Sequence, residues 1–228
     1  SIKPNVLIIF DNSGSMAYYP YLDNSSNKPY SCDTSGKTTT APVGVACTLS
    51  NINNFYGYFD RQKMYSYNST TKKFTIDATA SLSPNYKKAS SVTSCDNISN
   101  GSVLSGNYLN YMCMQKLDIV KNVLVGGKVD STAGAARNAA NGVTSFFLKT
   151  NGGKLVEYGI EEPQGLIQNL IAKVRFGLMT FNDNGSNVDS SNPSGDDGGV
   201  IDADLGTDMN TMVSTIENVV KASRTPLA

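Results

Sequence analysis

Histidine is absent from this 228-residue chain, and its absence removes several kinds of chemistry. A Ser-His-Asp triad, a Cys-His pair and a histidine-ligated zinc site all need an imidazole. The four cysteines form no C-x-x-C pair and lie near no other metal ligand at a spacing typical of zinc sites. Chemistry in this chain must therefore use oxygen ligands, lysine or cysteine.

An excess of one charge and a long apolar segment are also missing. The 19 basic and 19 acidic residues balance, and no cluster of lysine and arginine is dense enough to follow a phosphate backbone. We therefore expect no nucleic-acid partner. No stretch approaches the roughly 20 apolar residues of a membrane span, so we expect no transmembrane segment. No basic and then apolar leader precedes Ser1, so we expect an exported form to have lost its signal.

The cysteines are few but even in number. An even count in a chain rich in Asn, Ser, Thr, Tyr and Gly fits an exported protein with up to two disulfides. Of the three possible pairings, Cys32 with Cys47 and Cys95 with Cys113 are favoured because they close short loops. Four buried free thiols are the alternative.

Two parts of the chain differ in character, although its size fits a single domain over residues 1–228. Val6 to Phe10 is a continuous apolar run, typical of a strand that is covered on both faces in a parallel sheet. Residues 17 to about 107 are instead dominated by Tyr, Asn, Ser and Thr. This stretch predicts an irregular insertion, held by disulfides and by tyrosine packing.

Regular patterns return after the insertion and predict alternating helices and strands. Apolar residues recur at helical spacing from Tyr108 to Leu124, before a stop at Gly126-Gly127. Residues 131–142 fit either a helix or a loop, and Val143 to Leu148 fits a strand. We also expect a short helix over 164–172, a strand over 174–181, a long loop over 182–199, and a helix capped by Asp208 with an apolar stripe from Met209 to Val220.

This order indicates an α/β fold with a parallel or mixed sheet flanked by helices. Only two or three strong strands can be recognised, which is few for a sheet whose central strand is Val6 to Phe10. We therefore expect a fragment that is incomplete at its C-terminus.

The residues after the first strand are the strongest candidates for a site. Ligands of open α/β sheets bind at the carboxyl ends of the strands, where Asp11, Ser13 and Ser15 lie. Alternate residues of an extended loop project to one side, so D-x-S-x-S directs a carboxylate and two hydroxyls at one point. These hard oxygen ligands suit Mg²⁺ or Mn²⁺ with bound water, and Ca²⁺ less well. Taken alone, the pattern fits equally well a turn capped by Asp and Ser.

The segment "DNSGSM" after an apolar strand resembles the D-x-S-x-S motif of von Willebrand factor type A domains. In that family the motif forms a metal-ion-dependent adhesion site, together with a threonine and an aspartate from two later loops. The resemblance implies a Rossmann-like fold with a mostly parallel central sheet, in which "VRFGLMTF" is a strand and Thr225 of "TPLA" is the threonine ligand. The aspartate normally follows a later strand, and no residue of this chain matches it.

Four further segments resemble a narrower family. "KPNVLIIFDNSGSM", "NFYGYFDRQKMYSYN", "GNYLNYMCMQKLDIVKNVLVGGK" and "RFGLMTF" are similar to the amino-terminal region of PilY-type tip adhesins of bacterial type IV pili. The resemblance implies an extracellular protein, exported through the periplasm to the pilus on the cell surface. The implied partners are minor pilins and a host or surface ligand with an acidic group.

Other motifs have plainer explanations. The acid-rich loop lacks the D-x-D-x-D-G spacing of a calcium loop and fits a solvated loop: Asp183, Asp189, Asp196, Asp197, Asp202 and Asp204. Seven tyrosines fit either a contact surface or internal packing: Tyr18, Tyr19, Tyr21, Tyr56, Tyr58, Tyr65 and Tyr67. Neither Ser13 nor Ser15 lies in G-x-S-x-G, and Asp11 lacks the second acid that a phosphotransferase would need. We expect no enzyme.

Two functional hypotheses remain. In the first, a cation held by Asp11, Ser13, Ser15 and Thr225 binds an Asp or Glu of a partner at its open coordination position. In the second, the chain is a structural subunit of a pilus or other filament, and its metal site is vestigial or incomplete. Chelation separates the two hypotheses, because only the first predicts metal-dependent adhesion.

Overall fold

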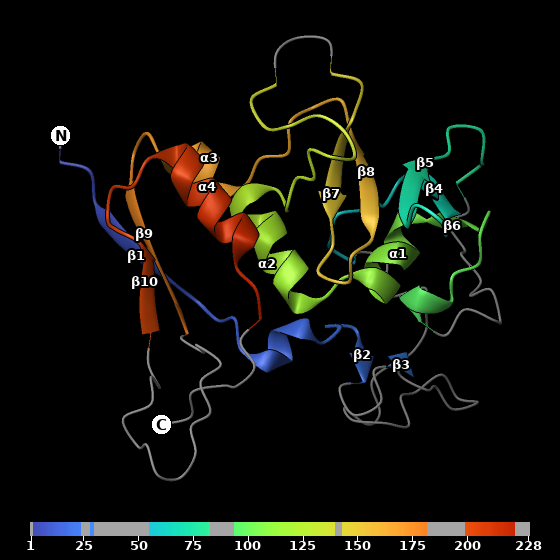
Figure 1. The fold of residues 1–228 in the computed structure, drawn as a ribbon, viewed down its shortest axis with the longest axis horizontal. Coiled ribbons are helices and arrows are strands. Elements are labelled where there is room, and N and C mark those ends of the chain that lie inside the picture. The colour runs from blue at the N-terminus through green and yellow to red at the C-terminus, as the bar shows by residue number, and fades with distance from the viewer. Residues whose placement is uncertain are drawn as a thin grey trace. The chain divides into compact units, whose positions relative to one another are not determined.

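The computed structural model describes residues 2–23, 28–29, 55–82, 94–139, 143–181 and 199–221 (Figure 1). The chain divides into two compact units. Unit 1 comprises residues 1–17, 120–128 and 164–228, and unit 2 comprises residues 18–119 and 129–163. Both units are mixed α/β. The insertion predicted from residue 17 to about 107 lies almost entirely in unit 2.

Unit 1 contains a three-stranded mixed sheet in the order β1-β9-β10. Its strands are β1 (Asn5–Phe10), β9 (Arg175–Phe181) and β10 (Gly199–Ala203). β1 runs parallel to β9, so both strands end at the same edge, and β10 runs antiparallel to β9. The strand predicted over 174–181 is thus confirmed. The adjoining loop was predicted over 182–199, but its residues 182–198 lie outside the described part.

The helix α4 (Met209–Asn218) packs against β9 and β10 and contacts the short helix α3 (Leu166–Leu170). The side chain of Asp208 accepts a hydrogen bond from the Thr211 N–H, the N-cap predicted from the sequence. Met212, Val213 and Ile216 are buried and form the core-facing stripe. Val220 was predicted to extend this stripe, but it lies beyond the helix and is exposed.

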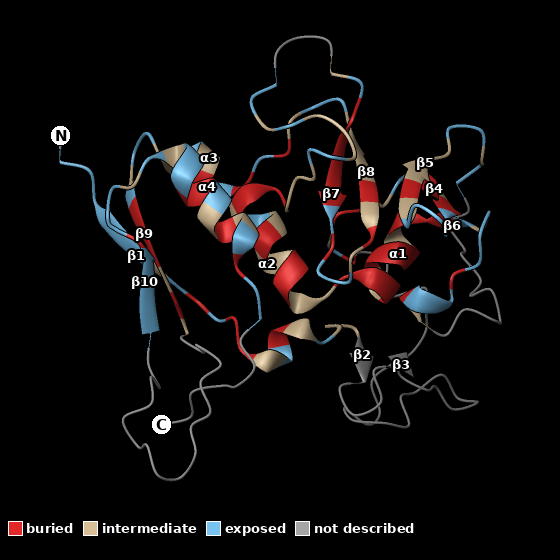
Figure 2. Cartoon of the chain, viewed as in Figure 1, coloured by how far each residue is buried: buried red, intermediate tan, exposed pale blue. Residues whose placement is uncertain are grey.

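Among the described residues, the strand β1 is not covered on both faces, contrary to the prediction from its apolar run. Val6, Leu7 and Ile9 are exposed, and only Phe10 at the end of the strand is buried (Figure 2). The helix α4 packs against β9 and β10, whereas Leu7 and Ile9 of β1 are exposed. An apolar run indicates a strand, but it does not show which faces of that strand are covered.

Unit 2 contains a five-stranded mixed sheet in the order β6-β4-β5-β8-β7. Its strands are β4 (Met64–Asn68), β5 (Lys73–Ile76), β6 (Val103–Ser105), β7 (Phe146–Lys149) and β8 (Leu155–Gly159). The described part of the insertion therefore includes three regular strands, β4, β5 and β6, which the prediction of an irregular segment did not include. A separate strand pair, β2 (Leu22–Asp23) and β3 (Lys28–Pro29), precedes the sheet.

A mostly parallel central sheet is not observed among the described strands. Both larger sheets are mixed, and parallel pairing is limited to β1 with β9 and β5 with β8. The strand predicted over 143–148 is present as β7, and residues 131–139 form turns. The structure thus supports an α/β class without confirming the finer fold that the resemblance implies.

Aromatic rings build the core of unit 2. Phe59 lies edge-on to Tyr65 and to Phe74, with ring centroids 5.1 Å apart in each pair. Tyr67 contacts Phe74 at 4.4 Å. Tyr58, Tyr65 and Tyr67 are buried, so packing explains these tyrosines, whereas Tyr18 and Tyr56 are exposed. Tyrosine rings thus add apolar surface to this core, beside its aliphatic residues.

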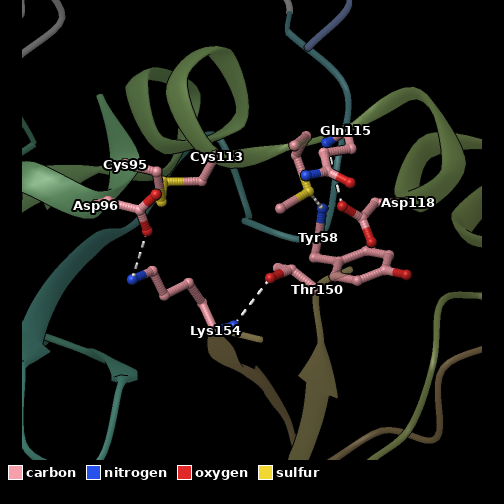
Figure 3. Close-up of a disulfide and its surroundings, with 9 residues drawn as sticks. Tyr58, Cys95, Asp96, Cys113, Gln115, Asp118, Thr150 and Lys154 are labelled. Carbon is pink, nitrogen blue, oxygen red and sulfur yellow. Dashed lines mark hydrogen bonds and ion pairs between the residues drawn. A yellow bond between two sulfur atoms is a disulfide. The ribbon is translucent and has the colours of Figure 1, made fainter. Parts of the chain in front are cut away.

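The disulfide between Cys95 and Cys113 is present, as the short-loop pairing predicted. It connects η2 (Cys95–Asn97) to the last residue of α1 (Gly106–Cys113), and both cysteines are buried. Beside it, the ammonium of Lys154 lies 3.0 Å from a carboxylate oxygen of Asp96 (Figure 3). Cys32 and Cys47 lie outside the described residues.

The helix predicted from Tyr108 to Leu124 is two helices, α1 and α2 (Lys116–Val125). The chain is extended at Met114, whose sulfur accepts a hydrogen bond from the Tyr58 N–H. The Gln115 N–H donates to the Asp118 carboxylate at 3.1 Å, which caps α2 (Figure 3). After α2, Gly126 and Gly127 both have positive φ, which confirms the predicted stop.

In the part of the chain that the structure describes, no helix has both the length and the apolar character needed to span a membrane.

Candidate functional site

The D-x-S-x-S loop begins where β1 ends and lies wholly in unit 1. Phe10 is buried at the end of the strand, and the 3₁₀ turn η1 (Gly14–Ala17) follows the loop. The Met16 N–H donates to the Ser13 carbonyl at 2.9 Å, and the Met16 side chain is buried. The loop is therefore anchored at both ends by apolar side chains.

The three predicted ligand residues lie together in this loop. The Ser13 N–H donates to the Asp11 carboxylate at 2.9 Å, and Ser13 Oγ lies 3.1 Å from Ser15 Oγ. Asp11 and Ser15 are exposed, whereas Ser13 is only 2% exposed. One carboxylate and two hydroxyls thus gather around a short turn, with two of the three side chains open to solvent.

The geometry of this loop fits a small divalent cation. Two ligands at adjacent positions of an octahedral Mg²⁺, each about 2.1 Å from the ion, lie about 3.0 Å apart. The two serine oxygens have nearly this separation. The same distance also suits a hydrogen bond between the two hydroxyls, which a bound ion would replace. All three side chains offer the hard oxygen ligands that Mg²⁺ and Mn²⁺ prefer.

In such a site, hydroxyl oxygens and ligands from outside the protein, such as water, would fill most of the coordination positions of the ion. Within the described ranges, no group of three or more His, Cys, Asp or Glu residues could hold a metal ion. The predicted ligand Thr225 lies outside the described residues, and so do four of the six aspartates of the acid-rich loop. Of that loop, Asp202 and Asp204 are described and exposed.

Asn12 is a residue that the sequence pattern leaves unspecified. Its side chain is 7% exposed and makes two long-range hydrogen bonds. The Phe181 N–H at the end of β9 donates to Asn12 Oδ1 at 3.0 Å, and Asn12 Nδ2 donates to the Val220 carbonyl beyond α4 at 3.2 Å. The sequence carries only a weak signal for this role, namely an amide at the carboxyl end of a strand.

Ionisable groups outside the loop are perturbed for structural reasons. Burial raises the pKa of the Tyr19, Tyr65 and Tyr158 hydroxyls. Burial alone would lower the pKa of Lys154, but its hydrogen bond to Asp96 raises the pKa overall. The Lys154 ammonium also lies 5.7 Å from the centre of the Tyr67 ring. These groups support packing in unit 2 and lie in a different unit from the Asp11 loop.

Comparison with known proteins relates part of the chain to one family. Neither curated proteins nor solved structures gave a match. Residues 46–149 match the family model described as PilY1 homolog, small alpha/beta domain. The matched range includes β4, β5, β6 and β7 with both intervening helices. This segment is therefore similar to the small alpha/beta domain of PilY1 homologues, and the match supports a PilY1-related protein.

Proposed function

We propose that this chain is a non-enzymatic adhesion and assembly module of a bacterial type IV pilus tip. The match to the small alpha/beta domain of PilY1 homologues suggests a function associated with type IV pili and supports this location. In this proposal the protein is exported through the periplasm and acts outside the cell. Its partners are minor pilins and a surface or host ligand that offers an acidic group.

The proposed contact is a metal-ion-dependent adhesion site of the von Willebrand type A kind. Asp11, Ser13 and Ser15 supply three ligands to Mg²⁺ or Mn²⁺, and Thr225, outside the described residues, supplies a fourth. The observation that supports this best is the 3.1 Å separation of the two serine hydroxyl oxygens beside the Asp11 carboxylate. The exposed sides of Asp11 and Ser15 leave room for a carboxylate of the partner to complete the coordination shell.

Calorimetric titration with Mg²⁺ or Mn²⁺ tests the site. Asp11→Ala should remove measurable binding, because it deletes the only carboxylate of the proposed ligand set. Asp77→Ala is a matched control: Asp77 also accepts hydrogen bonds from the backbone of a turn, including one from the Thr79 N–H at 3.0 Å. This control should bind the metal as the unmodified chain does. Equal metal affinity in Asp11→Ala and the unmodified chain would refute the site.

A second proposal keeps the pilus location without the metal. The described part of unit 2 has a regular sheet and a compact aromatic core, which suits a structural subunit that packs against other pilus proteins. The Asp11 loop is then a capped turn. Treatment with EDTA separates the two proposals, because adhesion through a metal should fall on chelation, whereas assembly through unit 2 should continue.

A further inference from the structure

Asn12 lies between the proposed ligands but faces away from solvent. Its neighbour Asp11 is exposed, while the Asn12 side chain is 7% exposed and bonded to backbone groups. A buried amide is costly unless its polar atoms are paired. Here one acceptor and one donor are both used, on segments 169 and 208 residues away in sequence.

The two partners of Asn12 come from different elements of unit 1. Phe181 is the last residue of β9, the strand that runs parallel to β1. Val220 belongs to the segment that leaves α4, and Thr225 follows later in that segment. One side chain therefore connects the Asp11 loop to both neighbouring segments at the carboxyl end of the sheet.

A second side chain, that of Lys121, also bonds to the end of α4 and the segment that follows it. Lys121 of α2 is 5% exposed, and its ammonium donates to the carbonyls of Glu217 at 2.8 Å and Val219 at 2.6 Å. A cation at the C-terminus of α4 also compensates for the partial negative charge there. Lys121 thus bonds to Glu217 and Val219 at the end of α4, and Asn12 bonds to Val220, the residue after Val219.

We infer that Asn12 is a positioning residue for the cation site, because it fixes the Asp11–Ser15 loop against the end of β9 and the segment leaving α4. This inference rests on the proposed function. Residues that orient metal ligands without touching the metal commonly change affinity about 10- to 100-fold when they are replaced. Asparagine suits this role because its amide supplies both a donor and an acceptor, whereas a carboxylate only accepts.

The closing experiment titrates Mn²⁺ into the full chain and follows free Mn²⁺ by electron paramagnetic resonance. Asn12→Ala should bind Mn²⁺ at least about tenfold more weakly than the unmodified chain. The matched control is Asn110→Ala, which removes another buried amide, in unit 2, that donates to the carbonyls of Phe55 and Phe59. The control should lose thermal stability but keep its Mn²⁺ affinity.

Asn12→Asp provides a second variant of nearly the same shape. At pH 8 a carboxylate can accept from the Phe181 N–H but cannot donate to the Val220 carbonyl. Positioning predicts weaker Mn²⁺ binding despite the added negative charge. A simple charge effect predicts tighter binding, and that result would overturn the inference.

Hydrogen exchange without metal measures the positioning itself. Asn12→Ala should speed exchange at the Ser13, Met16 and Phe181 amides, whose protons are bonded within this loop or to Asn12. Unchanged exchange there, or unchanged Mn²⁺ affinity, would overturn the positioning role alone. If the unmodified chain binds no Mn²⁺ at all, the proposed function and this inference both fail.

Discussion

At the scale of single residues, Tyr65 shows how a polar side chain can serve as core. Its ring is fully buried, and its hydroxyl oxygen accepts a hydrogen bond from the Asp60 N–H at 2.9 Å. Burial raises the pKa of this hydroxyl above the ordinary value of 10.0, because the phenolate would lose its hydration. The unfolded chain therefore releases this proton at a lower pH than the folded chain does.

Tyr65 should make the protein sensitive to alkali. Its contribution to the free energy of unfolding is constant below about pH 10 and falls as the pH rises further. Tyr65→Phe should cost about 1 kcal/mol at neutral pH, because the Asp60 N–H loses its partner. The same variant should lose less stability than the unmodified chain between pH 9 and 11, as measured by urea unfolding.

A control at a residue that does not titrate separates a general loss of stability from a change in its pH dependence. Phe74→Leu perturbs a fully buried ring in the same cluster and should lower stability equally at every pH. If Tyr65→Phe keeps the alkaline slope of the unmodified chain, Tyr65 is not the group responsible. Among the described residues, Tyr19 and Tyr158 would then be the next candidates, because burial also raises the pKa of their hydroxyls.

At the scale of elements, the sheet of unit 1 exposes one apolar face. Ile9 of β1 and Ile201 of β10 both pair with Met179 of β9, so the three side chains form a row across the sheet. Ile9 is 64% exposed and Ile201 is 61% exposed. Contiguous apolar surface of this kind binds apolar dyes and promotes association.

We therefore expect Ile9→Lys to reduce binding of the dye ANS and to reduce self-association measured by light scattering. Val123→Lys is the control, because Val123 is similarly exposed at 58% but lies on the helix α2, outside this row. The control should bind ANS as the unmodified chain does. Equal dye binding in Ile9→Lys and the unmodified chain would show that this face is covered in solution.

Elements were predictable from sequence where their buried residues are strongly apolar and recur at the spacing of a strand or a helix. The strand β9 and the helix α4 follow from Phe176, Leu178, Met212 and Ile216, all of which are buried. The strand β4 was missed because two of its buried residues are Tyr65 and Tyr67, which do not stand out in a segment rich in polar residues. The strand β5 was missed because it is short and buries a single residue, Phe74. The break between α1 and α2 was missed because helical spacing continues across it, while its cause, the contact of Met114 with Tyr58, is distant in sequence.

The candidate site was predictable only where its residues are close in sequence. Asp11, Ser13 and Ser15 are close in sequence, so the spacing of three residues already brings their oxygens together. The partners of Asn12 are Phe181 and Val220, which only the folded sheet brings near the loop. Local spacing thus explains why the candidate ligand oxygens lie together, whereas the hydrogen bonds of Asn12 depend on tertiary structure.

At the scale of the whole molecule, the main question is whether the two units unfold together. The sequence predicts one domain over residues 1–228, and this stays a prediction. Each unit has its own sheet, and the aromatic core and the Cys95–Cys113 disulfide both belong to unit 2. A change confined to one core therefore tests how strongly the two units are coupled.

Replacing both Cys95 and Cys113 by alanine should destabilise unit 2 selectively. The disulfide joins residues 18 positions apart, and closing a loop of about this length contributes about 3 kcal/mol. Hydrogen exchange should therefore speed up at the amides of β4 and β5 while staying slow in β9.

Ile216→Ala, which opens a cavity in the fully buried core under α4, should cost about 2–5 kcal/mol and give the reverse pattern. If each variant instead speeds exchange equally in both units, the chain unfolds as one cooperative domain, as the sequence predicts.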